Sequence, residues 1–95
     1  IKGKVMHNDK PIPFAKIYIK YNATDFPGAD VTLYDANMEA DLNGNFLVDH
    51  IYHGDYYFYA VGQDNAIAAP FIVKGGTHLK VKMLKEVTGF VIPVE

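Results

Sequence analysis

The sequence predicts an all-β fold, an antiparallel β-sandwich of about seven short strands with Greek-key connections. Apolar and polar residues alternate with a period of two almost throughout, and no stretch has the period of an amphipathic helix. Turn-forming residues recur about every eight to twelve positions. With 95 residues, 49% of them hydrophobic and 21% charged, we expect residues 1–95 to form one globular domain.

The N-terminal half contains the most regular predicted strand. Residues 1–5 alternate apolar and small side chains with lysines, and residues 7–11 are rich in turn formers. In residues 14–21 the alternation predicts a half-buried strand, whose inner face carries Ala15, Ile17, Ile19 and Tyr21. A loop is predicted over residues 22–30, and a less regular strand over residues 31–40.

The second half is predicted to consist of hairpins and one terminal strand. The pair Asn43-Gly44 tolerates positive φ, which predicts a hairpin turn followed by a return strand over residues 46–51. Residues 56–61 are rich in aromatic strand formers. A further hairpin is predicted to turn at Gly75-Gly76, and residues 87–95 to form an edge strand or a link to another segment.

The residue types that are missing exclude several function classes. The chain has no Cys, Ser, Trp or Arg, which excludes disulfides, thiolate zinc sites and Ser or Cys nucleophiles. Without Arg, the best ligand for phosphate and guanine is lacking, so we expect no nucleic-acid partner. No apolar run is long enough for a transmembrane segment. Because the chain begins at Ile1, we expect a mature or trimmed form of a longer product.

The charges are distributed unevenly along the chain. Residues 1–20 contain five Lys and one Asp, residues 21–73 contain seven Asp, one Glu and no Lys, and residues 74–95 contain four Lys and two Glu. Two ends of like sign are consistent with terminal strands that lie near each other. Solvated strand faces with acidic turns explain the rest, and the alternative is an acidic end that binds a basic partner or a cation.

Short motifs in a fixed order give the chain a family resemblance. They are Gly3-x-Val5, Pro11-Ile12-Pro13-Phe14-Ala15-x-Ile17-x-Ile19, Asp41-x-x-Gly44-x-Phe46, Ile51-x-x-Gly54-x-Tyr56 and Val81-x-Met83. With this series the chain resembles the carboxypeptidase regulatory-like domains, which are prealbumin-like (transthyretin-like) sandwiches. It differs from them at residues 22–38, which are longer than usual, and at Ala40, where Thr is common.

The resemblance implies a non-catalytic, extracytoplasmic module in the periplasm or on the cell surface. Such a domain occurs in bacterial lipoproteins, which are lipid-anchored through a preceding segment, or beside outer-membrane receptors. Its role would be scaffolding or the binding of a protein or glycan partner. Hydroxyisourate hydrolases of the transthyretin family need Arg and Ser, which this chain lacks. An alternative is a small-ligand carrier formed by dimerisation, as in transthyretin itself.

The aromatic residues supply the candidate binding site. Strand parity places Phe58, like Ile17 and Ile19, in the core. The same parity places three tyrosines on the outer face as a candidate binding face: Tyr18, Tyr57 and Tyr59. Tyrosine is large and amphipathic and suits protein or sugar contacts, and the alternative interpretation is cross-strand packing on a solvated face.

One cluster has the residue types of a metal site, namely Asp49, His50, His53 and Asp55. Two imidazoles and two carboxylates could bind zinc or iron. On a strand, however, His50 and His53 would point to opposite faces, so we expect exposed histidines beside a turn. We therefore predict no cofactor and keep a metal-dependent site as the alternative. A calcium loop over residues 35–45 fails the EF-hand spacing, and Asp41 is instead predicted to bind its own downstream amides.

Overall fold

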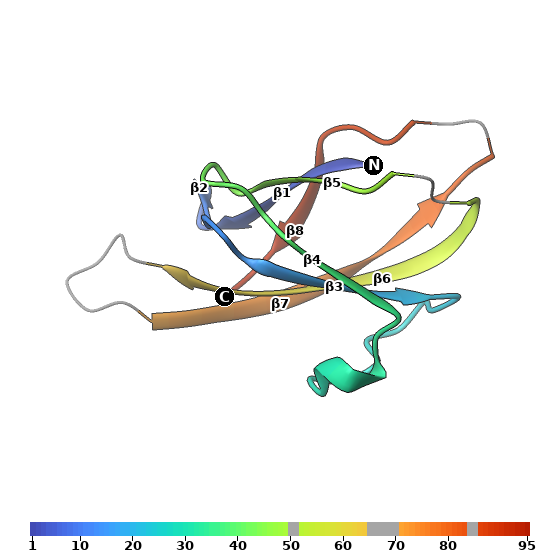
Figure 1. Cartoon of the computed structure of the whole chain (residues 1–95), viewed down its shortest axis with the longest axis horizontal. Helices are drawn as coiled ribbons and strands as arrows, with labels where there is room; N and C mark the ends of the chain where they lie inside the picture. Colours follow the sequence, from blue (N-terminus) through green and yellow to red (C-terminus); the bar gives the residue numbers. More distant parts are fainter. Residues whose placement is uncertain (50–51, 65–70, 84–85) are drawn as a thin grey trace.

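Two sheets packed face to face make up the part of the chain that the computed structural model describes, residues 1–49, 52–64, 71–83 and 86–95 (Figure 1). Sheet A contains β1 (Lys2–His7), β2 (Lys10–Pro11), β5 (Asn45–Leu47) and β8 (Phe90–Pro93). Sheet B has the order β4 (Ala36–Glu39), β3 (Lys16–Tyr21), β6 (Gly54–Asp64) and β7 (Phe71–Val81). The predicted all-β sandwich is confirmed, with eight strands in the described residues when the two-residue β2 is counted.

Strand β1 lies in the middle of sheet A and joins the two ends of the chain. It pairs with β5 in antiparallel fashion, with Gly3 opposite Phe46, and with β8 in parallel fashion, with Gly3 opposite Phe90. The parallel pair is the one exception to an otherwise antiparallel pairing in the described strands. The predicted proximity of the terminal strands is confirmed. Of residues 87–95, predicted to form an edge strand or a link to another segment, Phe90–Pro93 form strand β8.

The period-two alternation places the core side chains of sheet B correctly. Strands β3 and β6 are antiparallel, with Ile17 opposite Ala60 and Ile19 opposite Phe58, and all four side chains are buried. They face apolar side chains of sheet A and its connections, among them Val5, Ile12, Phe46 and Ile92. The predicted inner face is therefore confirmed at Ala15, Ile17 and Ile19, whereas Tyr21 is 45% exposed. The strand, predicted over residues 14–21, begins only at Lys16.

The turn at Asn43-Gly44 forms, but the predicted hairpin is wrong. The Asp41 carboxylate accepts hydrogen bonds from the amides of Asn43 (2.8 Å) and Asn45 (2.9 Å), as predicted, and Gly44 has a φ of 74°. The turn carries the chain from β4 in sheet B to β5 in sheet A, so the two strands do not pair. Alternation reveals which face of a strand is apolar, but it does not reveal which sheet the strand joins.

The strand predicted over residues 31–40 is also shorter than expected. Residues Val31–Leu33 form a 3₁₀ turn, capped by the Asp30 side chain, and only β4 is extended in a sheet. The return strand, predicted over residues 46–51, is limited to β5 in the described residues, and residues 50–51 lie outside them.

Gly75 and Gly76 do not form a turn, which corrects the second hairpin prediction. Both residues lie within the continuous strand β7. A Cβ on Gly75 would collide with the carbonyl oxygen of Pro93, so the glycine allows the C-terminal segment to cross close to β7. Glu95 and Lys74 exchange two backbone hydrogen bonds of 3.0 and 3.1 Å at this crossing. In the sequence, a Gly-Gly pair that allows another segment to pass close to a strand looks the same as a Gly-Gly pair in a turn.

The contacts at Gly44 predict a stability difference between two glycine substitutions. Gly44 and Gly89 both have positive φ, 74° and 71°, but a Cβ on Gly44 would lie 3.1 Å from the backbone of Ile12 and Val5, whereas Gly89 has open space. Gly44→Ala should lower the free energy of unfolding by about 1–3 kcal/mol, and Gly89→Ala by less. Urea unfolding of both variants measures the difference, and equal losses would contradict the role assigned to these contacts.

The register of β6 predicts a contrast between neighbouring aromatic residues. Phe58 is fully buried between the sheets, whereas Tyr57 is half-buried on the outer face. Phe58→Ala should cost about 3–5 kcal/mol through the cavity that it leaves, and Tyr57→Ala should cost clearly less. Chemical unfolding at one pH compares the two, and a greater loss from Tyr57→Ala would overturn the register.

Candidate functional site

The predicted binding face lies where parity places it, but it is not open to solvent throughout. Tyr18, Tyr57 and Tyr59 share the outer face of sheet B, with Tyr18 directly opposite Tyr59. Tyr59 is nevertheless only 4% exposed. Tyr59 therefore lies on the outer face, as predicted, but its side chain is not accessible to a ligand.

The loop of residues 22–35 covers this face. Its Phe26 ring lies 5.4 Å from that of Tyr59 and 5.8 Å from that of Tyr57, and Tyr34 stacks on Tyr59 at 5.8 Å. In Figure 1 the loop and its 3₁₀ turn lie on the outer side of sheet B. The face is thus largely used for packing within the chain.

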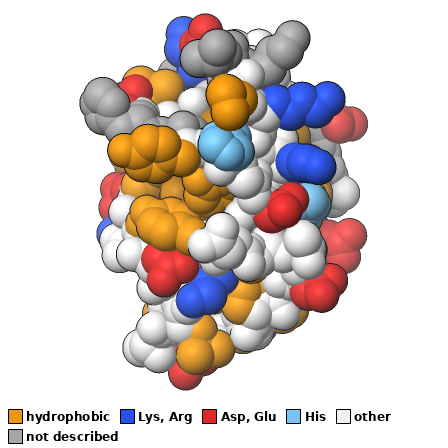
Figure 2. Space-filling view, turned by 90° about the vertical axis from the view of Figure 1, so that its right-hand side faces the viewer, with side chains coloured by type: hydrophobic (Ala, Val, Ile, Leu, Met, Phe, Trp, Pro, Cys, Tyr) orange, Lys and Arg blue, Asp and Glu red, His pale blue; other side chains and the backbone are white. Residues whose placement is uncertain are grey.

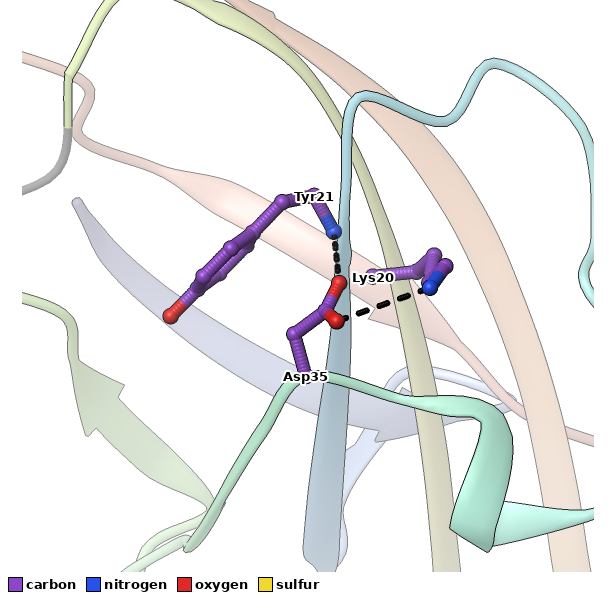
Figure 3. A network of polar contacts seen from close by, with 3 residues as sticks. All are labelled: Lys20, Tyr21 and Asp35. Carbon is purple, nitrogen blue, oxygen red and sulfur yellow. Dashed lines mark hydrogen bonds and ion pairs between the residues drawn. The ribbon is translucent and has the colours of Figure 1, made fainter.

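Polar contacts hold the 22–35 loop in place at its ends. Figure 3 shows the Asp35 carboxylate between β3 and the loop, accepting hydrogen bonds from the Tyr21 amide (2.8 Å) and from the Lys20 ammonium group (3.5 Å). The Asp35 amide donates to the carbonyl of Ile19 at 2.9 Å, and the Ala23 amide donates to the carbonyl of Asp55 at 3.3 Å. These bonds attach the loop to both β3 and β6.

Further contacts stiffen the loop internally. The Asp30 carboxylate accepts hydrogen bonds from the Thr32 hydroxyl (2.6 Å) and amide (3.0 Å), and these bonds lower the pKa of Asp30. The Tyr34 hydroxyl donates to the carbonyl of Gly28 at 2.9 Å. Burial of Tyr34 against the sheet, with smaller contributions from Tyr59 and Tyr57, raises the pKa of Tyr34 to about 12. The loop is therefore a preformed structure.

A second site is a cleft between the two sheets, at the end of the sandwich where β4 and β5 separate. Its volume is about 540 Å³, and Figure 2, which looks at this end of the molecule, shows hydrophobic side chains around a hollow beside a histidine. Apolar side chains and Tyr56 line its interior: Ile19, Ala36, Met38 and Val48. The residues at its mouth are Tyr21, Asn22, Leu47, Asp49, Tyr52 and His53. Asn37 also borders the cleft, but its side chain lies on the outer face of sheet B, opposite Tyr18.

Three tyrosines give the cleft its wall. Tyr21 and Tyr56 are opposite each other in β3 and β6, and their rings meet edge to face at 5.7 Å. The Tyr56 hydroxyl donates to the carbonyl of Tyr52 at 2.7 Å, and burial, together with Tyr21, raises the pKa of Tyr56. The Tyr52 side chain itself is 82% exposed. The wall thus has a fixed inner part and an accessible outer ring.

The polar side chains at the mouth are available for a ligand. Asn22, Asp49 and His53 are all exposed, and none of these side chains hydrogen bonds to another described residue. The cleft therefore combines an aromatic and aliphatic interior with amide, carboxylate and imidazole groups at its rim. This combination is typical of small-molecule sites. No pattern in the sequence indicates this cleft, although Tyr21 is the last inward-facing residue of its strand.

The residues of the alternative metal site do not act as one cluster in the described part of the chain. His50 lies outside the described residues. Asp49 and His53 lie at the cleft mouth, whereas Asp55 contacts Nε2 of His78 at 2.8 Å. Within residues 1–49, 52–64, 71–83 and 86–95, no group of three His, Asp or Glu side chains could hold a metal ion.

Comparisons with known proteins identify no relative. No family model matches the chain, and neither a curated protein nor a solved structure matches it. The resemblance to carboxypeptidase regulatory-like domains therefore stays a prediction. Among the described residues, no helix has the length and apolar character needed to cross a membrane.

The raised pKa of Tyr34 predicts the response of the protein to alkaline pH. Folding favours the uncharged phenol, so this contribution to stability is complete below pH 10 and declines as the pH rises from 10 to about 12. A spectrophotometric titration follows the ionisation of the tyrosine phenols. The Tyr34→Phe variant should show a smaller absorbance change near pH 12 than the parent protein. An unchanged amplitude in that phase would contradict the burial of Tyr34 against Tyr59.

Proposed function

We propose that the protein is a non-catalytic binding module that holds a carbohydrate in the cleft between the sheets. The observation that carries this proposal is the cleft itself, in which the tyrosine wall meets polar side chains that have no partner in the described chain. Its volume of about 540 Å³ falls in the range of roughly 300–1,000 Å³ that is common for ligand pockets.

Sugar rings match this combination of groups. A pyranose presents an apolar C–H face, which packs against the flat side of a tyrosine, and a rim of hydroxyl groups, which both donate and accept hydrogen bonds. In the cleft, Tyr52 and Tyr21 supply the aromatic surface, while Asn22 and Asp49 supply an amide and a carboxylate. A purely apolar ligand would leave these polar groups unpaired, which is unfavourable.

A binding role fits the residues better than catalysis does. The chain contains no Ser or Cys nucleophile. Among the described residues that line the cleft, Asp49 is the only carboxylate, whereas glycoside hydrolysis generally uses two.

The proposal includes a seven-stranded, prealbumin-like Greek-key topology and an extracytoplasmic location, for example in a surface lipoprotein. Both are supported by the ordered motifs that resemble carboxypeptidase regulatory-like domains.

Isothermal titration with a panel of soluble neutral and acidic oligosaccharides tests the proposal. We expect at least one member to bind, and Tyr52→Ala and Asp49→Ala each to weaken that binding by about tenfold or more. Both side chains are exposed, so neither variant should change the melting temperature appreciably. Phe14→Ala is the matched control, because Phe14 is an exposed aromatic residue outside the cleft.

Two results would contradict the proposal. One is the absence of binding to every member of the panel at millimolar concentration. The other is binding that survives unchanged in both cleft variants, because the sugar would then occupy another surface.

A further inference from the structure

The 22–35 loop presents an unusual surface for a segment that is so firmly held. Three of its apolar side chains are exposed, with fractions of 51% for Phe26, 39% for Val31 and 48% for Leu33. The loop contains carboxylates but no lysine, and Asp25 and Asp30 are the acidic side chains not paired with a cation in the described chain. Exposed apolar residues on a rigid, acidic support indicate an interaction surface.

A groove of complementary character lies on the outer face of sheet A. Its volume is about 580 Å³, and its floor includes the exposed side chains of Leu47 and Val91 from β5 and β8. Lys2 and Lys4 from the central strand β1 lie between them, with Lys2 opposite Leu47 and Lys4 opposite Val91. Neither lysine forms an ion pair with another described residue. Asp41 also lines the groove, but its carboxylate accepts the amides of Asn43 and Asn45.

We propose that this groove binds the 22–35 loop of a second copy of the chain. The apolar side chains Val31 and Leu33 would cover Leu47 and Val91, and the carboxylates of Asp25 and Asp30 would approach the ammonium groups of Lys2 and Lys4. The loop is already ordered by its own hydrogen bonds, so its binding requires little further loss of conformational entropy.

The position of the two surfaces determines the kind of assembly. The loop lies on the outer side of sheet B and the groove on the outer side of sheet A, so the two surfaces are on opposite sides of the sandwich (Figure 1). One copy would contact one neighbour through its loop and another through its groove. Such a head-to-tail contact forms rows or rings of subunits instead of a symmetric dimer. The inference does not depend on sugar binding, because the groove and the cleft are different sites. Among the described residues, they have only Leu47 in common.

A mixing experiment with two variants tests the inference. Leu33→Asp damages the loop and leaves the groove intact, whereas Val91→Asp damages the groove and leaves the loop intact. Sedimentation velocity of the parent protein should show mass increasing with concentration, and added salt should reduce it. Each variant alone should be monomeric, while an equimolar mixture should form a dimer of one copy of each variant and nothing larger.

Near-UV circular dichroism and melting temperature verify that both variants are folded, as expected for exposed sites. A second groove variant, Lys4→Glu, should also be monomeric and should pair with Leu33→Asp in the same way. The inference is overturned if the parent stays monomeric at the highest soluble concentration, if folded variants still self-associate, or if the mixture contains only monomers.

Discussion

The contact of Phe58 with Phe46 and Phe90 holds the two sheets together. Phe58 belongs to sheet B and is fully buried, and its ring meets Phe90 edge to face at 5.0 Å and Phe46 at 6.1 Å. Phe46 and Phe90 lie in β5 and β8, on the two sides of β1. Gly3 of β1 leaves room for the Phe46 ring, since a Cβ there would overlap it. Where β4 and β5 separate, the described residues form no such cluster between the sheets, and the cleft lies there.

Much of the fold could be predicted from local sequence patterns. The alternation of Ile17, Ile19 and Phe58 gave the correct buried faces, because burial of one sheet face fixes the strand register. The Asp41 carboxylate binds the amides that turn chemistry predicts. Pairing between distant strands could not be predicted in this way. Gly75 lies within a strand, where the absence of a side chain allows Pro93, eighteen positions later, to pass close to it. The residues next to Gly75 in the sequence do not indicate this contact.

The candidate site was less predictable than the fold. Parity placed Tyr59 on the outer face, but Phe26 and Tyr34 cover it from a loop whose course no periodic pattern describes. The cleft brings together Tyr21, Met38 and Tyr52 from three separate segments, so its residues form no motif in the sequence. Its one local signal is a tyrosine at the end of an apolar strand face, where a core residue would usually be aliphatic.

A double-mutant cycle between Phe58 and Phe90 tests most directly whether aromatic contacts between the sheets stabilise the sandwich. The free energy of unfolding would be measured for the parent, Phe58→Leu, Phe90→Leu and the double variant. The edge-to-face geometry at 5.0 Å leads us to expect a coupling energy of about 0.5–1.5 kcal/mol. If the two losses are simply additive, the rings do not interact across the sheets, and the account of how the sandwich is held together is contradicted.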